Sequence, residues 1–175
     1  MNDVSRQCIG RATPRTCSVN LFKVRGGRQR FFGIAGTYPD MALSIRIGVS
    51  AMDFESVHGW LSATYWSPGI SRETVERAAS GSSMVIGAFE DDRQVGYCRV
   101  VSDRATFAWV CDVFVAETHR GQGVARMMVG KALADPEHQG LRRWLLATKD
   151  AHGVYAELGF LSLTNPERWM IYRPT

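Results

Sequence analysis

Apolar and polar positions divide most of the chain into short segments with either a strand or a helix period. Residues 44–49 alternate polar and apolar side chains, which is typical of a strand with one buried face. Residues 53–64 repeat apolar side chains three and four positions apart and predict a helix, and Ser71 is a suitable N-cap for a second helix. Residues 84–102 form two strand-like runs around the turn at 91–93, which predicts a β-hairpin.

A longer apolar run, residues 107–115, is followed by a polar turn with two glycines and then by a helical pattern. The turn reads Arg120-Gly121-Gln122-Gly123, and residues 124–134 repeat apolar side chains along one helical face. Glycine lets the backbone approach a ligand closely, and the first N–H groups of a helix have no acceptor within it. The turn and the helix start are therefore a candidate site for a phosphate or another anion.

Two common phosphate-binding patterns do not fit this turn. A Walker loop needs Lys and then Ser or Thr directly after its last glycine, but Val124 and Ala125 follow Gly123. The dinucleotide fingerprint needs a third glycine where Arg126 stands. From this turn alone, an ordinary strand-to-helix connection without a ligand stays open as the alternative.

The rest of the chain continues the alternation of strands and helices. After a break at Pro136, residues 142–147 predict a strand and residues 151–158 a short helix, and residues 161–163 and 169–172 predict two final strand pieces. This order of segments predicts an α/β (α+β) domain in which a mixed sheet carries helices on both faces.

Two motifs at a fixed separation resemble the GNAT N-acetyltransferase superfamily. Arg120-x-x-Gly123-x-Ala125, after an apolar strand, is similar to the acyl-CoA pyrophosphate loop of that family. About 30 residues later, a strand and a short helix lead into Tyr155-Ala-Glu-Leu-Gly-Phe160, which looks like the second family segment. The resemblance covers residues 44–173. It implies a mostly antiparallel sheet whose strands before and after the loop splay apart, with the acyl-CoA site between them.

The resemblance also implies acetyl-CoA as co-substrate and assigns residues to it. Backbone N–H groups of the loop would hold the pyrophosphate, while two strand residues and one later side chain would contact the pantetheine arm and the acetyl carbonyl. The implied cofactor-binding residues are Val113, Val115, Arg120, Gly121, Gln122, Gly123, Val124, Ala125 and Thr148. Family members often carry Asn where Thr148 stands, so this contact is expected to be weaker or missing here. No metal is expected.

Two residues are candidates for moving protons. Tyr155 aligns with the tyrosine that protonates the leaving thiolate in many family members; a core tyrosine that anchors the helix is the alternative. Asp112 is a lone carboxylate in an apolar strand, which raises its pKa unless it is paired, and it is the candidate general base. A structural carboxylate paired with an arginine is the competing interpretation. His119 and His152 are weaker candidates.

Direct transfer within a ternary complex is expected, because no motif marks a nucleophilic cysteine. Strand alternation predicts that Cys111 faces away from Asp112. Asp150 is interpreted as the N-cap of the helix that carries Tyr155.

The acceptor amine is expected near aromatic residues. In the family, the loop between the first two helices commonly forms one wall of the acceptor site, so Trp60, Tyr65 and Trp66 are the candidate substrate-binding residues. The alternative is that Trp60 belongs to the core and the other two cover it. A small amine, an antibiotic, an amino acid and a protein amine all remain open as acceptors.

Charge and cysteine content bear on the nature of residues 1–43 and on the cellular compartment of the protein. The net charge of +4 comes from residues 1–40, which hold seven Lys/Arg and two Asp/Glu, whereas residues 41–175 hold fourteen and fifteen. Residues 1–43 are therefore interpreted as a poorly ordered basic extension before a domain at 44–175. A targeting segment, a nucleic-acid arm or a true start at Met41 are alternatives for it. Four cysteines without a C-x-x-C pair predict a reducing cytoplasm.

The sequence as a whole predicts a cytoplasmic, acetyl-CoA-dependent N-acetyltransferase that acts on a small-molecule or protein amine. A catalytically inactive acyl-CoA-binding regulatory module is the alternative. Neither a membrane nor a nucleic acid is expected as a partner, and a homodimer stays open.

Overall fold

A computed structural model describes residues 43–174, and all structural statements refer to this range. The predictions for the basic extension and for Met41 fall outside the described residues. The strands are β1 Leu43–Ile47, β2 Met84–Glu90, β3 Arg93–Ser102, β4 Phe107–Val115 and β5 Arg143–Leu145. The helices are α1 Phe54–Ser62, α2 Arg72–Ser80, α3 Val124–Leu133 and α4 His152–Ala156. Four short 3-10 helices lie at Val49–Ala51, Glu117–His119, Pro136–His138 and Pro166–Arg168.

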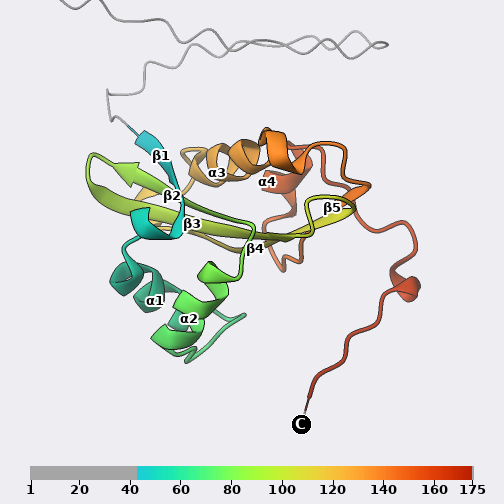
Figure 1. Cartoon of the computed structure of the whole chain (residues 1–175), viewed down its shortest axis with the longest axis horizontal. Coiled ribbons are helices and arrows are strands. Elements are labelled where there is room, and N and C mark those ends of the chain that lie inside the picture. Colours follow the sequence, from blue (N-terminus) through green and yellow to red (C-terminus); the bar gives the residue numbers. More distant parts are fainter. Residues whose placement is uncertain (1–42, 175) are drawn as a thin grey trace, which may run out of the picture. The chain divides into compact units, whose positions relative to one another are not determined.

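The strands form one five-stranded sheet in the order β1-β2-β3-β4-β5. The pairs β1–β2, β2–β3 and β3–β4 are antiparallel, and the pair β4–β5 is parallel. Helices α1 and α2 lie on one side of the sheet, and α3 and α4 lie on the other (Figure 1). The predicted mixed, mostly antiparallel sheet with helices on both faces is confirmed.

Each face of the sheet is covered by the apolar side of its helices. Val57 and Leu61 of α1, one turn apart, pack with Tyr97 of β3 in one buried cluster. Val124 and Met128 of α3 belong to a second cluster on the opposite face. Burial of each such side chain contributes about 1.5–3 kcal/mol, so both helices are held mainly by their apolar face rather than by helix propensity.

Polar side chains define where several elements begin. Ser71 Oγ accepts a hydrogen bond from Thr74 N at 3.2 Å, which confirms it as the N-cap of α2. At the turn between β3 and β4, Asp103 Oδ1 accepts from three consecutive backbone N–H groups, those of Ala105, Thr106 and Phe107. Such local bonds satisfy backbone groups that would otherwise lack partners.

The predicted strand pieces at 161–163 and 169–172 are wrong, because neither segment belongs to a strand in the structure. Leu161 is 91% exposed and Met170 is 98% exposed. An apolar run expresses only a local preference, whereas a strand also needs a neighbouring edge that accepts its backbone hydrogen bonds. β5, which is the edge next to this region, contains three residues rather than the predicted six.

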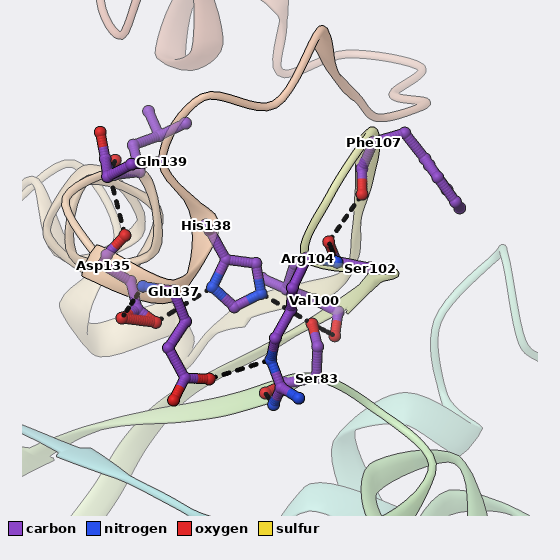
Figure 2. A network of polar contacts seen from close by, with 10 residues as sticks. Ser83, Val100, Ser102, Arg104, Phe107, Asp135, Glu137, His138 and Gln139 are labelled. Atoms are coloured by element: carbon purple, nitrogen blue, oxygen red, sulfur yellow. Dashed lines mark hydrogen bonds and ion pairs between the residues drawn. The ribbon is translucent and has the colours of Figure 1, made fainter.

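A hydrogen-bonded network ties the end of α3 to the start of β2 (Figure 2). The ring of His138 lies 3.0 Å from Asp135 Oδ2 through Nδ1 and 2.9 Å from Ser83 Oγ through Nε2. Arg104 adds a hydrogen bond to the Ser83 carbonyl at 2.9 Å and an ion pair with Glu137. The Ser–His–Asp order is that of a nucleophile with its base, but His138 is only 2% exposed. The network is therefore a structural tie.

Candidate active site

A β-bulge at Asp112 shapes the centre of the site. Arg99 of β3 is opposite Cys111, and Tyr97 is opposite Phe114, so Asp112 and the residue after it share one position of the opposite strand. The φ angle of Asp112 is 52°, in the left-handed region that is rare for a residue with a side chain. A bulge bends its strand and increases the local twist.

Strands β4 and β5 separate after Trp109, before the bulge is reached, and leave a cleft. They pair only between Phe107–Trp109 and Arg143–Leu145. The cleft has a volume of about 1480 Å³ and is bounded by the glycine turn, the β5–α4 loop and the α1–α2 loop. The predicted site residues that line it are Trp60, Tyr65, Trp66, Asp112, Val113, Val115, Arg120, Gly121, Gly123, Val124, Ala125, Thr148 and Tyr155. Gln122 is the exception, because its Nε2 donates to the Thr118 carbonyl at 2.9 Å.

The glycine turn presents a run of unused backbone donors. Gly121 and Gly123 have φ angles of 75° and 82°, which a residue with a side chain rarely adopts. Gly123 is the N-cap of α3 and provides no side-chain cap. Within residues 43–174, no N–H group from Gly121 to Arg126 has a hydrogen-bond acceptor. Six consecutive free donors at a helix start fit a pyrophosphate group.

The arginines near this turn are engaged with neighbouring residues. Arg120 Nε donates to the Val115 carbonyl at 3.1 Å, and its guanidinium also contacts Glu117. Arg126 forms an ion pair with Glu157, which joins α3 to the residues after α4. The anion-binding capacity of the turn therefore comes from its backbone rather than from a free guanidinium.

The backbone of β4 has an open edge along the cleft. Ala116 N donates to the Val95 carbonyl of β3 at 2.8 Å. Because successive residues of a strand direct their backbone groups to opposite edges, Val115 and Val113 direct theirs away from β3. β5 does not extend to these residues. Their polar groups thus face the cleft, where an extended ligand can pair with them as an added strand would.

The short helix α4 places Tyr155 in the lining of the cleft, where it is 8% exposed. The pKa of the phenol is raised to about 12, and burial is the largest cause of this shift. The ring packs edge-on against Phe160, and the hydroxyl makes no hydrogen bond to any other described residue. The helix begins differently from the prediction: Thr148 Oγ accepts from Ala151 N at 3.1 Å, and the side chain of Asp150 caps nothing. The prediction of Asp150 as N-cap is therefore wrong.

Asp112 forms an ion pair with an arginine of the neighbouring strand. Its Oδ2 lies 2.5 Å from Arg99 Nε, and the two side chains are 16% and 19% exposed. The sequence left open a paired carboxylate, and this is the arrangement observed. Because cross-strand partners point to the same face, Cys111 shares the face of Arg99. The prediction that Cys111 faces away from Asp112 fails, since the bulge breaks the alternation.

Comparison with known proteins identifies the family of the chain. The model of the acetyltransferase (GNAT) family matches residues 51–160, which include the glycine turn and Tyr155. The chain belongs to the GNAT family.

Solved structures agree with this assignment. A GNAT-family protein from Xanthomonas campestris pv. campestris is 40% identical, with a TM-score of 0.69, over 75% of this chain and 94% of the other. A GNAT-family acetyltransferase from Streptococcus pneumoniae is 24% identical, with a TM-score of 0.60, over 75% and 98%, and shows the shared fold. No protein with a curated description matches the chain. Family and fold together support acetyl transfer.

An aromatic wall lies across the cleft from the glycine turn in this GNAT protein. Trp60 stacks on Phe114 with centroids 5.1 Å apart, and Tyr65 meets Trp66 edge to face at 4.9 Å. Lys149 N donates to the Tyr65 hydroxyl at 3.2 Å, which connects the α1–α2 loop to the β5–α4 loop. Trp60 thus packs into the apolar layer, whereas Tyr65 and Trp66 are exposed at the cleft.

The two histidines named from the sequence lie outside the lining of the cleft. His119 is buried, with Nδ1 2.8 Å from Thr118 Oγ and Nε2 3.4 Å from Glu90 Oε2. His152 is exposed at the start of α4. Residues 43–174 contain no cluster of three metal-binding side chains. No helix in the same range is long and apolar enough to span a bilayer.

Sequence reasoning missed Arg99, Phe114 and Lys149 as lining residues. The partner of Asp112 was detectable in part, because counting outward from the turn at Asp103 places the second half of β3 opposite β4. The contacts of Lys149 had no local signal, since its partner Tyr65 is 84 positions away.

Proposed function

We propose that this GNAT protein transfers an acetyl group from acetyl-CoA directly to an amine. The observation that carries the proposal is that one cleft joins the free N–H groups of the glycine turn, the open edge of β4 and the Tyr155 hydroxyl. When bound, acetyl-CoA supplies the acetyl thioester and the thiolate that leaves.

The residues of the chain divide the work of binding. The backbone N–H groups from Gly121 to Arg126 hold the pyrophosphate, and the left-handed glycines leave room for it. The backbone groups of Val113 and Val115 bind the pantetheine arm. An N–H group of this edge, directed at the acetyl carbonyl, stabilises the negative charge that develops on its oxygen.

Tyr155 is the proposed proton donor to the thiolate. With a pKa of about 12, the phenol stays protonated throughout the neutral range and always has a proton to give. Because a phenol of this pKa is a weaker acid than a thiol, transfer accompanies rather than precedes cleavage of the C–S bond.

Asp112 is the proposed acceptor of the amine proton. Arg99 engages Oδ2, and Oδ1 has no partner in the described part of the chain.

The nearby Cys111 is not the nucleophile in this proposal: burial raises the pKa of its thiol to about 11, so the reactive thiolate is scarce at neutral pH. The free thiols of Cys98 and Cys111 support a reducing cytoplasm as the setting.

Calorimetric titration with acetyl-CoA tests the binding half of this proposal. Gly123→Asp places a carboxylate at the first turn of α3, and we expect affinity to fall at least 100-fold, because the charge repels the pyrophosphate and displaces it. Gly140→Asp is the matched control: Gly140 has a positive φ of 75°, against 82° for Gly123, but it does not line the cleft. If both variants bind acetyl-CoA with equal affinity, the glycine turn does not hold the pyrophosphate.

Measurement of turnover tests the catalytic part of the proposal. With an amine acceptor and detection of free thiol, Tyr155→Phe should lower kcat about 100-fold while calorimetric affinity for acetyl-CoA stays within a factor of three. Tight acetyl-CoA binding without acetylation of any amine would instead indicate an acyl-CoA-binding regulatory module.

A further inference from the structure

The charges along the cleft are nearly all neutralised by one another. Three arginine–carboxylate pairs account for most of them: Arg99–Asp112, Arg120–Glu117 and Arg126–Glu157. Two lining residues are left, Lys149 and Asp150, and neither forms an ion pair with any residue from 43 to 174. The cleft therefore offers one cation and one anion to a ligand.

Lys149 is held on the aromatic wall of the cleft. Its backbone N–H donates to the Tyr65 hydroxyl, and its ammonium lies 5.6 Å from the centroid of the same ring. A cation near a ring face is attracted by the electron density of the ring, and the Lys149 ammonium donates no hydrogen bond to residues 43–174. These donors are free for an anionic group on a ligand that lies against Tyr65 and Trp66.

Asp150 follows directly in the same loop, is exposed, and lines the cleft that Tyr155 also lines. Its carboxylate has no ion-pair partner among residues 43–174, so it can attract an ammonium group of a ligand into the part of the cleft that this loop lines.

We propose that the acceptor is an amine that also carries an anionic group, a carboxylate or a phosphate. The anion binds Lys149, the amine approaches Asp150 and Tyr155, and the apolar part of the acceptor lies on Tyr65 and Trp66. This inference rests on the proposed acetyltransferase function. Lys149 is in this view a specificity-determining residue, which selects among amines without taking part in the transfer.

Pairs of acceptors that differ only in the anionic group test the inference. Phenylalanine and phenethylamine differ by a carboxylate, and phosphoethanolamine and ethanolamine differ by a phosphate, so the two pairs also distinguish the two anions. We expect at least one pair to show about a tenfold higher kcat/KM for the anionic member, expressed mainly in KM. Equal kcat/KM within both pairs would overturn the inference while leaving the enzyme an acetyltransferase.

Variants of Lys149 make the assignment residue-specific. Lys149→Met should lower the preference for the anionic acceptor roughly fivefold, and Lys149→Glu should lower it further, since exposed charge pairs contribute modestly and like charges repel. Lys131→Met is the matched control, because Lys131 is exposed on α3 and does not line the cleft. If Lys149→Met instead raises KM for acetyl-CoA and leaves the acceptor preference unchanged, Lys149 binds the cofactor and the inference fails.

A binding measurement keeps this test separate from that of the proposed function. If no amine is acetylated, the proposed function fails, and calorimetric titration with N-acetylphenylalanine and N-acetylphenethylamine still examines the site. Tighter binding of the carboxylate, lost in Lys149→Met and retained in Lys131→Met, would support the inference. Equal binding of the two compounds would overturn it.

Discussion

The two walls of the cleft are built in different ways. The glycine turn and the start of α3 use backbone donors from one short segment, Gly121 to Arg126. The aromatic wall depends on side chains from distant segments, such as Trp60 on Phe114 and Tyr65 with Lys149. The cofactor side is thus a local structure supported by the core, whereas the acceptor side exists only once the chain has folded.

The core under α3 supports the glycine turn, so its loss should have the largest effect on stability. Met128 is fully buried, and Met128→Ala should lower the free energy of unfolding by about 3 kcal/mol through lost burial and a cavity. Met127, one position earlier, is 36% exposed, and Met127→Ala should change it by less than about 0.5 kcal/mol. Chemical denaturation of both variants measures the difference, and equal losses would contradict this account of α3.

The Arg99–Asp112 ion pair crosses from β3 to the bulge in β4. Arg99→Met leaves a mostly buried carboxylate without its partner, which should cost about 2 kcal/mol of unfolding free energy after allowance for partial exposure. The exposed pair Arg72–Glu76 is the control, since solvent screens it and Arg72→Met should lower the free energy of unfolding much less than Arg99→Met. A loss at Arg99 no greater than that at Arg72 would show that the bulge does not depend on the pair.

The hydrogen bond between Lys149 N and the Tyr65 hydroxyl joins the two loops at the acceptor side. Tyr65→Phe removes this acceptor but keeps the ring, so KM for the amine should rise roughly threefold to fivefold through a looser wall. Affinity for acetyl-CoA should stay within a factor of two, because the glycine turn does not contact this loop in the proposed arrangement. A parallel loss of acetyl-CoA affinity would mean that the two walls are not independent.

The Asp103 turn contributes the smallest effect, and its contribution depends on pH. Hydrogen bonds to the Asp103 carboxylate, first from the Thr106 hydroxyl and then from backbone N–H groups, hold its pKa well below the usual 3.8. A carboxylate whose pKa is lower in the folded state stabilises the fold above the unfolded pKa and loses this contribution as pH falls through the folded value. The Tm advantage of the native chain over Asp103→Ala should therefore shrink between about pH 5 and pH 2. A constant advantage across that range would contradict the charged carboxylate as its source.

The fold was largely predictable because most of its elements express local patterns. The apolar run at 107–115 became β4 with the same bounds, and the helix predicted at 124–134 is α3, one residue shorter. Ser71 capped α2 because an N-cap depends only on residues within one turn. The strand pieces near the C-terminus failed for the opposite reason, since pairing needs an edge that lies elsewhere in the chain.

The candidate site was predictable where the chemistry is carried by the backbone. Positive φ at Gly121 and Gly123 follows from residue type, and the free N–H groups follow from the start of a helix. The left-handed conformation of Asp112 had no such signal, because aspartate adopts other backbone conformations far more often. The bulge, and with it the shared face of Cys111 and Asp112, depends on the register of two strands.

The types and order of the elements up to α4, the glycine turn and the position of Tyr155 in a short helix could be predicted from the sequence alone. The pairing of Arg99 with Asp112, the contact of Tyr65 with Lys149 and the separation of β4 from β5 appear only in the folded chain. The difference lies in how far apart in sequence the interacting residues are. Periodicity, caps and glycine conformations depend on neighbours within about one helical turn, whereas ion pairs and cleft walls depend on strand register and on packing between residues far apart in sequence.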